Sequence, residues 1–306
     1  MSIKQISISN FRCFNNIDLE FSELNNFIYG ANGSGKTSVL EALYFCSTGR
    51  SFKSSNKNLC IQNNKGAFKI QVDTFENNKI CISKQTKKSM TLEIDETKAT
   101  SIELFRTIPS TLLDNKTFSM FADTPKYRRK IFDRCLIASD QNYSKEFFSF
   151  HRALKQRNAA LKFKRLTNID MWSEVFINSG TLISEKRNKF FEETKQTFFK
   201  LAKNLNDIRI LEIINSLEIF FHKGWVSEHS LKESLELNRD SDQRRTSTTS
   251  GPHKADIKFL IKKSDIKYIL SRGEQKFMSI LWCLSMHKTL SDFHGVKPFL
   301  IIDDIH

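Results

Sequence analysis

The residues from Gly30 to Thr37 read Gly-Ala-Asn-Gly-Ser-Gly-Lys-Thr, which fits the pattern G-x-x-x-x-G-K-[ST] of a phosphate-binding loop. A short apolar run, Phe27 to Tyr29, precedes the loop and predicts a buried strand. The apolar-rich stretch from Val39 to Phe45 follows it and predicts a helix. Strand, glycine loop and helix in this order are the context that the pattern requires, so an ordinary glycine-rich turn is the less favoured interpretation.

The residue types in this loop suit the chemistry of phosphate binding. Glycines let the backbone amides wrap closely around phosphate oxygens, and the start of the following helix adds a partial positive charge. We expect Lys36 to reach the β- and γ-phosphates of ATP and the Thr37 hydroxyl to bind Mg²⁺. The predicted nucleotide-binding residues of this segment are Gly30, Ala31, Asn32, Gly33, Ser34, Gly35, Lys36, Thr37 and Ser38.

Two carboxylates follow an apolar run near the end of the sequence. Phe299 to Ile302 predicts a buried strand, and Asp303 and Asp304 come directly after it. In a parallel sheet, ligands bind beyond the carboxyl ends of the strands. We therefore expect Asp303 to hold Mg²⁺ and Asp304 to orient an attacking water, which makes Asp304 and Lys36 the catalytic candidates. The alternative for the two acids is a solvated turn.

A third segment, Leu270 to Lys276, opens a predicted helix that extends through Leu290. Ser271 with Glu274 three residues later predicts a capping box, and the bare amide of Gly273 at a capped helix start is also suited to an anion. The segment resembles the signature sequence of ABC-type ATPases, which contacts the nucleotide bound to the other subunit. That resemblance adds Ser271 and Gly273 to the nucleotide-binding candidates.

Outside these segments, the spacing of the apolar residues changes along the sequence from the period of strands to that of helices and back. Alternation at Ile6 and Ile8 and again from Ile17 to Phe21 predicts two strands joined by a turn at Asn15-Asn16, and short alternating segments within 67–113 predict further strands. Helical spacing follows, and Asn238 to Ser250 has loop character. The helical stripes consist of Phe147, Phe150, Leu154 and Leu161, then Trp172, Phe176, Ile183 and Phe190. We expect these stripes to form a core, the alternative being an aromatic platform for stacking bases.

These elements predict an α/β fold with three parts. Residues 1–124 would form the N-terminal part of an ATPase head with the phosphate loop, and residues 125–240 a helical insertion. Residues 241–306 would return to the head, with a strand at Ile257 to Ile261 and the acidic strand at the end.

Composition excludes several classes of protein. The 306 residues include 48 Lys and Arg against 34 Asp and Glu, a net charge of +14, and only ten Gly and four Pro, which excludes collagen-like and linker-like chains. No run approaches the roughly 18 apolar residues of a membrane span, and the first residues lack a signal-peptide stretch. The six cysteines lie at wide, irregular spacings, which argues against a disulfide framework or zinc site and favours the reducing cytoplasm.

The positive charge is concentrated between Lys126 and Arg165. This stretch holds twelve Lys and Arg against three acids, an excess of nine out of the net fourteen. Such concentration suits a polyanion, because Lys and Arg near phosphates release counterions from nucleic acid, although such contacts do not specify base sequence. A solvated helical face is the alternative. The DNA-binding candidates are Lys126, Arg128, Arg129, Lys130, Arg152, Lys155 and Arg157.

The order of these segments resembles the RecF family, bacterial recombination and gap-repair ATPases related to the SMC and Rad50 proteins. The opening Ile6 to Phe14 is similar to the N-terminal strand motif of the whole group. Other stretches resemble RecF in particular, and the last of them is the most specific: Thr37 to Tyr44 through Gly49 to Lys53, Arg128 to Asp133, Lys155 to Ala159, and Gly251 to Asp256.

The resemblance implies an ABC-type P-loop ATPase head, a mixed β-sheet with flanking helices, interrupted by a helical second domain. It implies ATP and Mg²⁺ as cofactors, an ATP-dependent homodimer that clamps duplex DNA, gapped DNA or a junction of single and double strands, and slow hydrolysis that reopens the clamp. RecR, and RecO with it, would be the protein partners.

Three departures from the family pattern accompany the resemblance. Thr246 stands where the family usually has Gly, and Glu274 replaces a common Gln. Family members also continue for a few dozen residues beyond the position of His306, so we expect an incomplete head. Two alternatives stay open at this stage: a nucleotide-binding assembly module without turnover, since Asp304 stands where many ABC ATPases have Glu, and the ATPase part of a nuclease of the overcoming-lysogenisation type.

Overall fold

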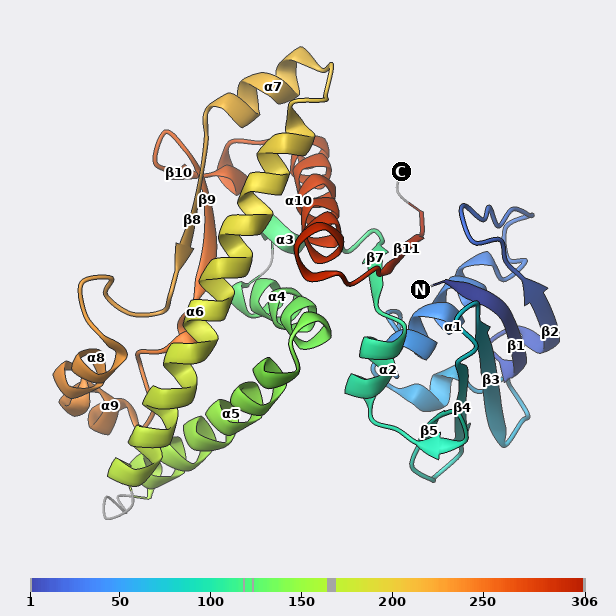
Figure 1. The fold of residues 1–306 in the computed structure, drawn as a ribbon, viewed down its shortest axis with the longest axis horizontal. Coiled ribbons are helices and arrows are strands. Elements are labelled where there is room, and N and C mark those ends of the chain that lie inside the picture. The colour runs from blue at the N-terminus through green and yellow to red at the C-terminus, as the bar shows by residue number, and fades with distance from the viewer. Residues whose placement is uncertain (1, 118, 123, 164–168, 305–306) are drawn as a thin grey trace. The chain divides into compact units, whose positions relative to one another are not determined.

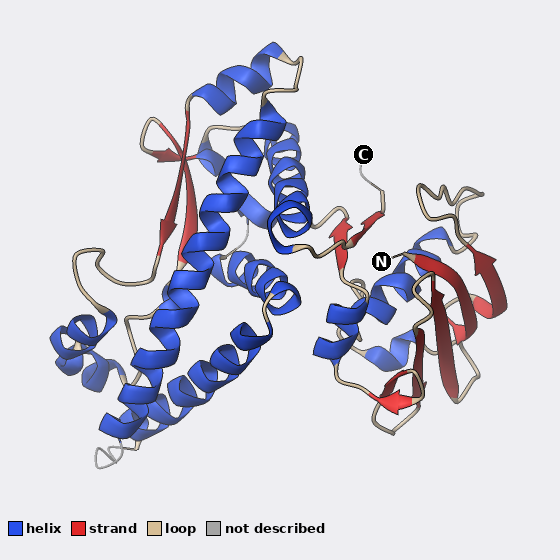
Figure 2. Ribbon diagram, in the orientation of Figure 1, coloured by secondary structure: helices blue, strands red, loops and turns tan. Residues whose placement is uncertain are grey.

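The computed structural model describes residues 2–117, 119–122, 124–163 and 169–304. The chain divides into two compact units, one formed by Met1–Lys116 with Gly295–His306 and the other by Thr117–His294. We call them the phosphate-loop unit and the helical unit. Strands dominate the first unit and helices the second (Figures 1 and 2). Residues 241–294 belong to the helical unit because their long helix and their strands pack on it, whereas the sequence grouped them with the ATPase head.

The phosphate-loop unit is built on a six-stranded antiparallel sheet with the order β2-β1-β3-β4-β5-β6. Alternating apolar residues line its covered face, where Ile6, Ile8, Ile70 and Val72 are buried. This alternation was the predicted pattern, and it is confirmed. The strands are β1 (Ile3–Phe11), β2 (Phe14–Glu20), β3 (Ala67–Thr74), β4 (Lys79–Gln85), β5 (Thr91–Ile94) and β6 (Thr97–Lys98).

Helix α1 covers this sheet and follows the phosphate loop directly (Figure 1). Its Phe45 packs edge-on against Phe11 and Phe68, with ring centroids 6.1 and 5.5 Å away. A separate parallel pair, β7 with β11, also contacts α1. The remaining elements are α1 (Lys36–Thr48), a 3₁₀ turn (Lys57–Cys60), α2 (Ser101–Thr107), β7 (Ser110–Leu113) and β11 (Phe299–Ile302).

Three local predictions in this unit are wrong. The first hairpin turns at Arg12 and Cys13, because Phe11 pairs with Phe14 and the two asparagines lie within β2. Phe27 to Tyr29 forms no strand, and Phe27 and Tyr29 are 87% and 91% exposed. Among the described residues, no strand pairs with this segment to supply a hydrogen-bonding ladder. The β11 strand forms as predicted but is not buried throughout, since Ile301 alone of its residues is buried.

The helical unit is organised around the long helix α6, which packs against α5 on one side and α10 on another (Figure 1). The predicted Phe stripes form its core: Phe150, Phe176 and Phe190 are fully buried, as the sequence suggested. Its helices are α3 (Ser119–Ala122), α4 (Pro125–Ser139), α5 (Gln141–Lys162), α6 (Ile169–Ala202), α7 (Ile208–Asn215), α8 (Leu231–Leu237), α9 (Arg239–Arg245) and α10 (Arg272–His294).

A three-stranded antiparallel sheet, β10-β9-β8, completes this unit. Phe259 of the central strand stands edge-on to Trp282 of α10 at 5.0 Å, which fastens the sheet to the helices. Its members are β8 (Leu217–His222), β9 (Asp256–Ile261) and β10 (Ser264–Asp265), with 3₁₀ turns at Pro252–Lys254 and Ile266–Tyr268.

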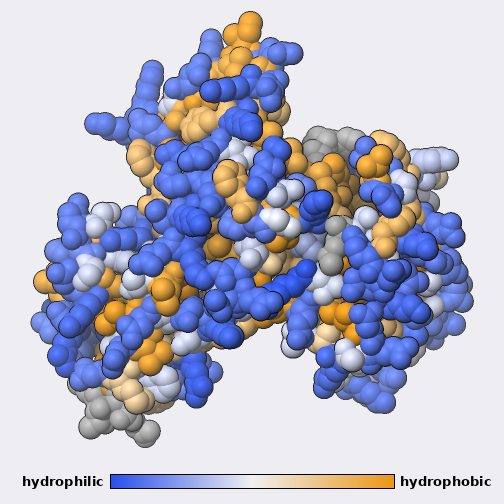
Figure 3. All heavy atoms as spheres, viewed as in Figure 1, coloured by the Kyte–Doolittle hydropathy of each residue, from blue (hydrophilic) through white to orange (hydrophobic). Residues whose placement is uncertain are grey.

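The stretch predicted as a loop, Asn238 to Ser250, contains the helix α9 instead. Acids in its first turn and arginines in its last turn complement the helix dipole and so favour a helix. The loop prediction considered the polar residue types and not the order of their charges. Among the described residues, no helix is both long and apolar enough to cross a membrane. Hydrophilic side chains cover most of the face of each unit shown in Figure 3.

Candidate functional site

The phosphate loop has the backbone geometry that its glycines allow. Gly33 and Gly35 have φ values of 82° and 97°, a region that favours glycine. A Cβ atom on Gly35 would lie 2.5 Å from the Phe14 ring and 2.7 Å from the Cys13 sulfur. Gly35 is therefore required both by its dihedral angles and by the close approach of the β1–β2 turn.

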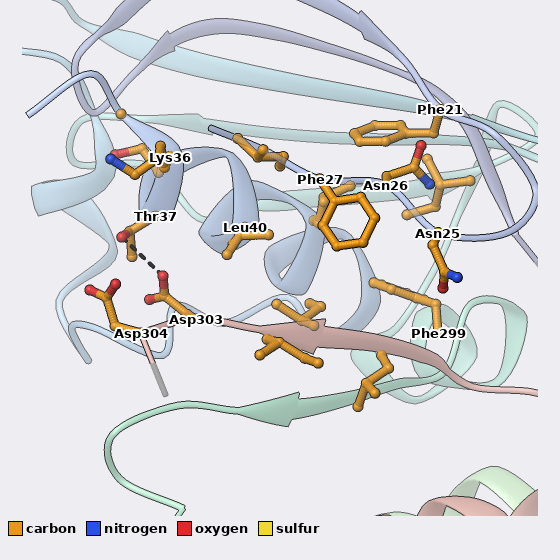
Figure 4. Close-up of a pocket in the computed structure, with 18 of the residues that line it drawn as sticks. Phe21, Asn25, Asn26, Phe27, Lys36, Thr37, Leu40, Phe299, Asp303 and Asp304 are labelled. Carbon is orange, nitrogen blue, oxygen red and sulfur yellow. Dashed lines mark hydrogen bonds between the residues drawn. The ribbon is translucent and has the colours of Figure 1, made fainter. Parts of the chain in front are cut away.

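Lys36 and Thr37, both half-buried, begin helix α1 at the end of the loop. The Lys36 ammonium donates hydrogen bonds to the carbonyls of Gly30 and Ala31, at 2.8 and 3.0 Å. The Thr37 hydroxyl donates to Asp303 Oδ1 at 3.1 Å, across 266 residues of sequence (Figure 4). The structure thus brings together the loop and the acidic strand end that the sequence proposed as one site.

Asp303 is held in place by β11, which is paired in parallel with β7. Its backbone N–H also donates to Leu113 O at 2.9 Å, so the carboxylate sits at the carboxyl end of both strands. Burial raises the pKa of Asp303 above the ordinary value, and the charge of Asp304 adds to this, whereas the Thr37 hydrogen bond opposes it. A cation at this point would relieve the unfavourable charge.

The residues present fit Mg²⁺ in a nucleotide complex. A threonine hydroxyl and a carboxylate oxygen at hydrogen-bond distance are hard oxygen donors, and Mg²⁺ in such sites takes one or two protein ligands and completes its shell with phosphates and water. Thr37 and Asp303 would hold the ion, which when bound would neutralise charge on the phosphates. No group of three or more His, Cys, Asp or Glu in the described part of the chain forms a metal site of its own.

A cavity of about 1020 Å³ extends from this point. At its polar end lie Lys36, Thr37, Asp303 and Asp304, and its other end holds aromatic side chains that include Phe27 (Figure 4). Phe27 and Ile28, which form no strand, are part of its wall. The volume is ample for a nucleotide.

The signature segment begins α10 in the helical unit. Ser271 N donates to Glu274 Oε2 at 2.7 Å and Glu274 N donates to Ser271 Oγ at 3.3 Å, so the predicted capping box is confirmed. Arg209 also donates to Glu274, at 2.9 Å, and the capping hydrogen bonds lower the Glu274 pKa. Ser271 and Gly273 are exposed, and a Cβ on Gly273 would meet open space.

The DNA-binding candidates separate into two groups. Arg128 and Arg157 are buried and paired with carboxylates, Arg128 Nε with Asp256 at 2.7 Å and Arg157 Nη1 with Asp242 at 2.8 Å. Their assignment to DNA is wrong for this conformation, because the guanidinium groups are shielded and already bonded. Arg129, partly buried, donates to Ala255 O at 2.6 Å.

The other candidates are exposed: Lys126 and Lys130 on α4, and Arg152 and Lys155 on α5. Of the basic stretch as a whole, Lys164 and Arg165 lie outside the described residues. Sequence reasoning missed Lys145 and Lys162, which share the exposed side of α5. The helical period of the stretch, applied to its charges as well as to its phenylalanines, could have found them.

Sequence reasoning also missed Lys53, which lines the cavity beside the phosphate loop, and the pair Arg12 and Glu41 behind that loop. The sequence did contain a sign of this pair. Glu41 is a charged residue inside the apolar stretch Val39 to Phe45, and a buried charge needs a partner that pairs or hydrogen-bonds with it.

Comparison with known proteins identifies the class. A family model described as "RecF/RecN/SMC N terminal domain" matches residues 2–306, so the chain belongs to that family. Within it, the DNA replication and repair protein RecF of Pseudoalteromonas translucida (strain TAC 125) is 33% identical over 313 residues, covering 100% of this chain and 84% of that protein. RecF of Francisella tularensis subsp. mediasiatica (strain FSC147) is 30% identical, covering 100% of this chain and 87% of the relative. The chain is thus a member of the RecF family.

Solved structures agree with this placement. The recombination mediator protein RecF with ATP, in the RecFOR pathway, superposes with a TM-score of 0.86 at 26% identity, covering 99% of this chain and 85% of that one. An Smc head bound to the C-winged helix domain of ScpA has a TM-score of 0.51 at 12% identity, covering 99% of this chain, and shows the fold alone. The expected ATPase-head fold is confirmed.

Proposed function

We propose that this chain is an ATP-dependent DNA-binding clamp of the RecF kind, acting in recombinational repair and the processing of replication gaps. ATP with Mg²⁺ would bind the phosphate loop, drive two heads together and close them on DNA, and slow hydrolysis would reset the clamp. The observation that carries the proposal is the hydrogen bond between Thr37 and Asp303, which joins the loop and the acidic strand end into one polar site.

The nucleotide roles follow from this geometry. Backbone amides at the start of α1 would bind phosphate oxygens, and Lys36 would exchange its two carbonyl partners for the β- and γ-phosphates. Thr37 and Asp303 would position the metal. Asp304, which is exposed beside Asp303, would orient the attacking water, and Ser271 and Gly273 would close over the phosphates held by a second copy.

The exposed side of α5 would meet the DNA. It presents Lys145, Arg152, Lys155 and Lys162, and the exposed positions of this helix include no Asp or Glu. Lys145 and Lys162 are 17 positions apart, so at ~1.5 Å per residue the basic row is about 25 Å long. Such a row neutralises several phosphates without reading bases, as a clamp on duplex, gapped or junction DNA requires.

The ATP role is tested by equilibrium binding of ATP in the presence of Mg²⁺. Lys36→Ala should lower ATP affinity about a hundredfold, because it removes the charge nearest the terminal phosphates. Asp303→Asn should weaken binding with Mg²⁺ and have little effect when Mg²⁺ is chelated. Unchanged affinity in Lys36→Ala would exclude the phosphate loop as the site.

The DNA role is tested by retention of a gapped duplex with ATP or with ADP at matched salt. A Lys145→Gln, Arg152→Gln, Lys155→Gln triple variant should reduce the slope of log affinity against log salt by about three. The matched control changes exposed lysines elsewhere in the helical unit, Lys189, Lys200 and Lys232, to Gln. Binding that is the same with ATP and ADP would contradict the clamp.

A second candidate function is a nucleotide-binding module that assembles with ATP but does not turn it over. It is favoured by the catalytic position, where Asp304 has a shorter side chain than the Glu of many ABC ATPases. Phosphate release measured with DNA present separates the two, with Lys36→Ala as the background. In either case, the RecFOR pathway named for the RecF–ATP structure makes RecR and RecO the protein partners to test. A second copy of this chain would be the ATP-dependent partner, contacted through the exposed Ser271 and Gly273.

A further inference from the structure

The exposed side of α5 carries an aromatic side chain within its basic row. Phe148 is 54% exposed. It lies three positions after Lys145 and four before Arg152, and Lys155 follows three positions further on. Residues three or four positions apart on a helix lie on the same face, so these four side chains form one row. At ~1.5 Å per residue, the ring lies about 4.5 Å along the helix axis from Lys145 and about 6 Å from Arg152.

Packing within the unit explains the neighbouring core residue but not Phe148. Phe150, two positions later, is fully buried and packs against Phe176 of α6, with ring centroids 4.8 Å apart. A step of two positions turns a helix by more than half a circle, so Phe148 faces away from that core. A single exposed apolar residue is ordinary by itself. The surroundings of Phe148 are therefore what can give it a role.

Neighbouring rings hold the Phe148 side chain in place. Phe147 stands edge-on to it, with ring centroids 5.8 Å apart. Phe147 in turn packs against His151 at 4.3 Å and against Tyr143 at 6.1 Å. Tyr143 is fully buried, and its hydroxyl donates to Asp133 at 2.6 Å. These contacts tie the exposed ring to the core, which reduces the side-chain freedom that is lost when the ring binds a ligand.

Cations flank the ring on the same face of the helix. The Arg152 guanidinium lies over the Trp172 ring of α6, 5.9 Å from its centroid, a contact that keeps it on this face. Among the described residues of α5, the exposed positions include no Asp or Glu. A nucleic acid strand whose phosphates bind Lys145 and Arg152 would pass directly over the ring between them.

We propose that Phe148 stacks on an unpaired base of single-stranded DNA whose phosphates follow the basic row of α5. This face of the helical unit then favours gapped DNA or a junction over an intact duplex. The proposal rests on the DNA contact proposed above and deepens it, because it names the DNA structure that the contact selects.

The chemistry of the face favours a base over other occupants. An aromatic ring stacks on the flat face of any base, which is open in a single strand and covered by neighbouring bases in a duplex. Such stacking tolerates any sequence, as a face that reads no base edges requires. A membrane or a stable protein interface would need a larger contiguous apolar area than one ring among cations.

The test compares the affinities of a gapped duplex and of an intact duplex of the same length, with ATP and at matched salt. The parent chain should bind the gapped duplex more tightly. Phe148→Leu should weaken binding to the gapped duplex about tenfold and binding to the intact duplex much less, and Phe148→Trp should keep the parent's preference. A parent chain without the preference, or a Phe148→Leu variant that retains it, would overturn the proposal.

The matched control is Phe293→Leu, which removes a ring of similar exposure on α10. Phe293 is 52% exposed and follows the acidic residue Asp292. This variant should bind both DNAs like the parent chain. An equal loss of preference in Phe293→Leu and Phe148→Leu would refute a specific role for Phe148.

The Lys145→Gln, Arg152→Gln, Lys155→Gln triple variant, measured in parallel, distinguishes failure of this inference from failure of the DNA role. The triple variant should reduce the salt slope for both DNAs, whereas Phe148→Leu should keep it, because no charge is removed. If the triple variant weakens binding and Phe148→Leu keeps the preference, α5 contacts DNA and the stacking role is refuted. If the triple variant binds both DNAs like the parent chain, the DNA contact at α5 fails and the stacking role fails with it.

Discussion

The two units contain carboxylates of two kinds: one kind is available to a ligand, and the other is already hydrogen-bonded within the protein. In the phosphate-loop unit, Asp303 stands at the edge of a cavity, bonded to a hydroxyl and partly exposed. In the helical unit, Asp133 is buried and accepts two hydrogen bonds from Arg187, at 2.8 and 2.9 Å, and one from the Tyr143 hydroxyl at 2.6 Å. The first carboxylate is left available for a ligand, and the second is saturated. A charged group therefore serves function or structure according to its burial and to whether its hydrogen bonds are already made within the protein, and not according to its residue type.

This contrast explains why a basic stretch of sequence does not translate directly into a basic surface. The buried arginines Arg128, Arg157 and Arg187 each bind a carboxylate far away in sequence and so fasten α4, α5 and α6 to the rest of the unit. Burial alone would lower the pKa of Arg187, but the Asp133 carboxylate outweighs it and raises that pKa above the ordinary value. Arg187 therefore stays charged in the folded chain.

Breaking the buried ion pair of Arg187 and Asp133 should cause the largest loss of stability. Arg187→Met leaves the Asp133 carboxylate buried with one neutral donor, and it also removes a hydrogen bond to Pro252 O at 2.7 Å. We expect a loss of about 3–5 kcal/mol in the free energy of unfolding. Urea denaturation followed by circular dichroism measures it.

The control for this prediction is Arg152→Met, on the exposed side of α5, which should change stability by no more than about 1 kcal/mol. The Arg187→Met, Asp133→Asn double variant should recover part of the loss, because Asn carries no charge and still accepts the Tyr143 hydroxyl. A double variant less stable than Arg187→Met would show that the buried charge is not the cause.

The phosphate-loop unit should be most sensitive to a change of shape, since its site depends on backbone amides. Gly35→Ala places a methyl group in the left-handed region and against Phe14 and Cys13. We expect ATP affinity to fall by about 3 kcal/mol, from the strained dihedral and the overpacking together. Calorimetric titration with ATP and Mg²⁺ measures it.

Gly66→Ala is the matched control, because Gly66 has open space around it and is not among the positive-φ residues. It should bind ATP like the parent chain. Equal losses in the two variants would mean that general destabilisation, and not the loop geometry, sets the affinity.

A half-buried histidine makes the stability of the helical unit depend on pH. His253 packs against Phe150 and Phe176, its Nε2 lies 2.9 Å from Thr248 O, and burial lowers its pKa to about 4 from the ordinary 6.5. Below pH 6.5 the unfolded chain takes up a proton and the folded chain does not. Stability therefore falls as the pH drops from about 6.5 toward 4, by ~2 kcal/mol between pH 7 and pH 5.

Measuring unfolding at pH 7 and at pH 5 tests this effect. The parent chain should lose more stability than His253→Gln over that interval, because glutamine does not titrate. The same loss in both chains would place the titrating groups elsewhere.

The sequence was most informative where local pattern and chemistry coincide. Gly30 to Thr37 fixed the loop, and the strand ending in Asp303 was found from its apolar run and its acids, so the Thr37–Asp303 contact could be anticipated across 266 residues. The strand predicted at Phe27 to Tyr29 does not form, because three apolar residues do not specify a strand without a neighbouring strand to pair with. Lys53 was missed because no local motif marks it, and only the folded chain places it at the cavity.

In the helical unit, periodicity predicted the helices and their Phe core, but not which charged side chains are buried and which are exposed. Arg157 and Lys155 are two positions apart on α5, yet one is buried against Asp242 and the other is exposed. The acid that decides this lies 85 residues later in the chain. No local pattern contains that information, whereas helix phase would have placed Lys145 and Lys162 with the exposed group.

The smallest expected effect lies at the end of α9, where a β-branched residue occupies a glycine conformation. Thr246 closes this helix with φ 51° and ψ 30°, and it is exposed, so its side chain packs against nothing that Gly would lose. The left-handed conformation costs an L-residue about 1–2 kcal/mol, and the greater freedom of Gly in the unfolded chain returns about half of that. Thr246→Gly should therefore raise the free energy of unfolding by about 0.5–1 kcal/mol, seen as a higher urea midpoint. Ser247→Gly, at a neighbour without positive φ, should lower it; a lower midpoint in Thr246→Gly as well would show that the threonine is not strained.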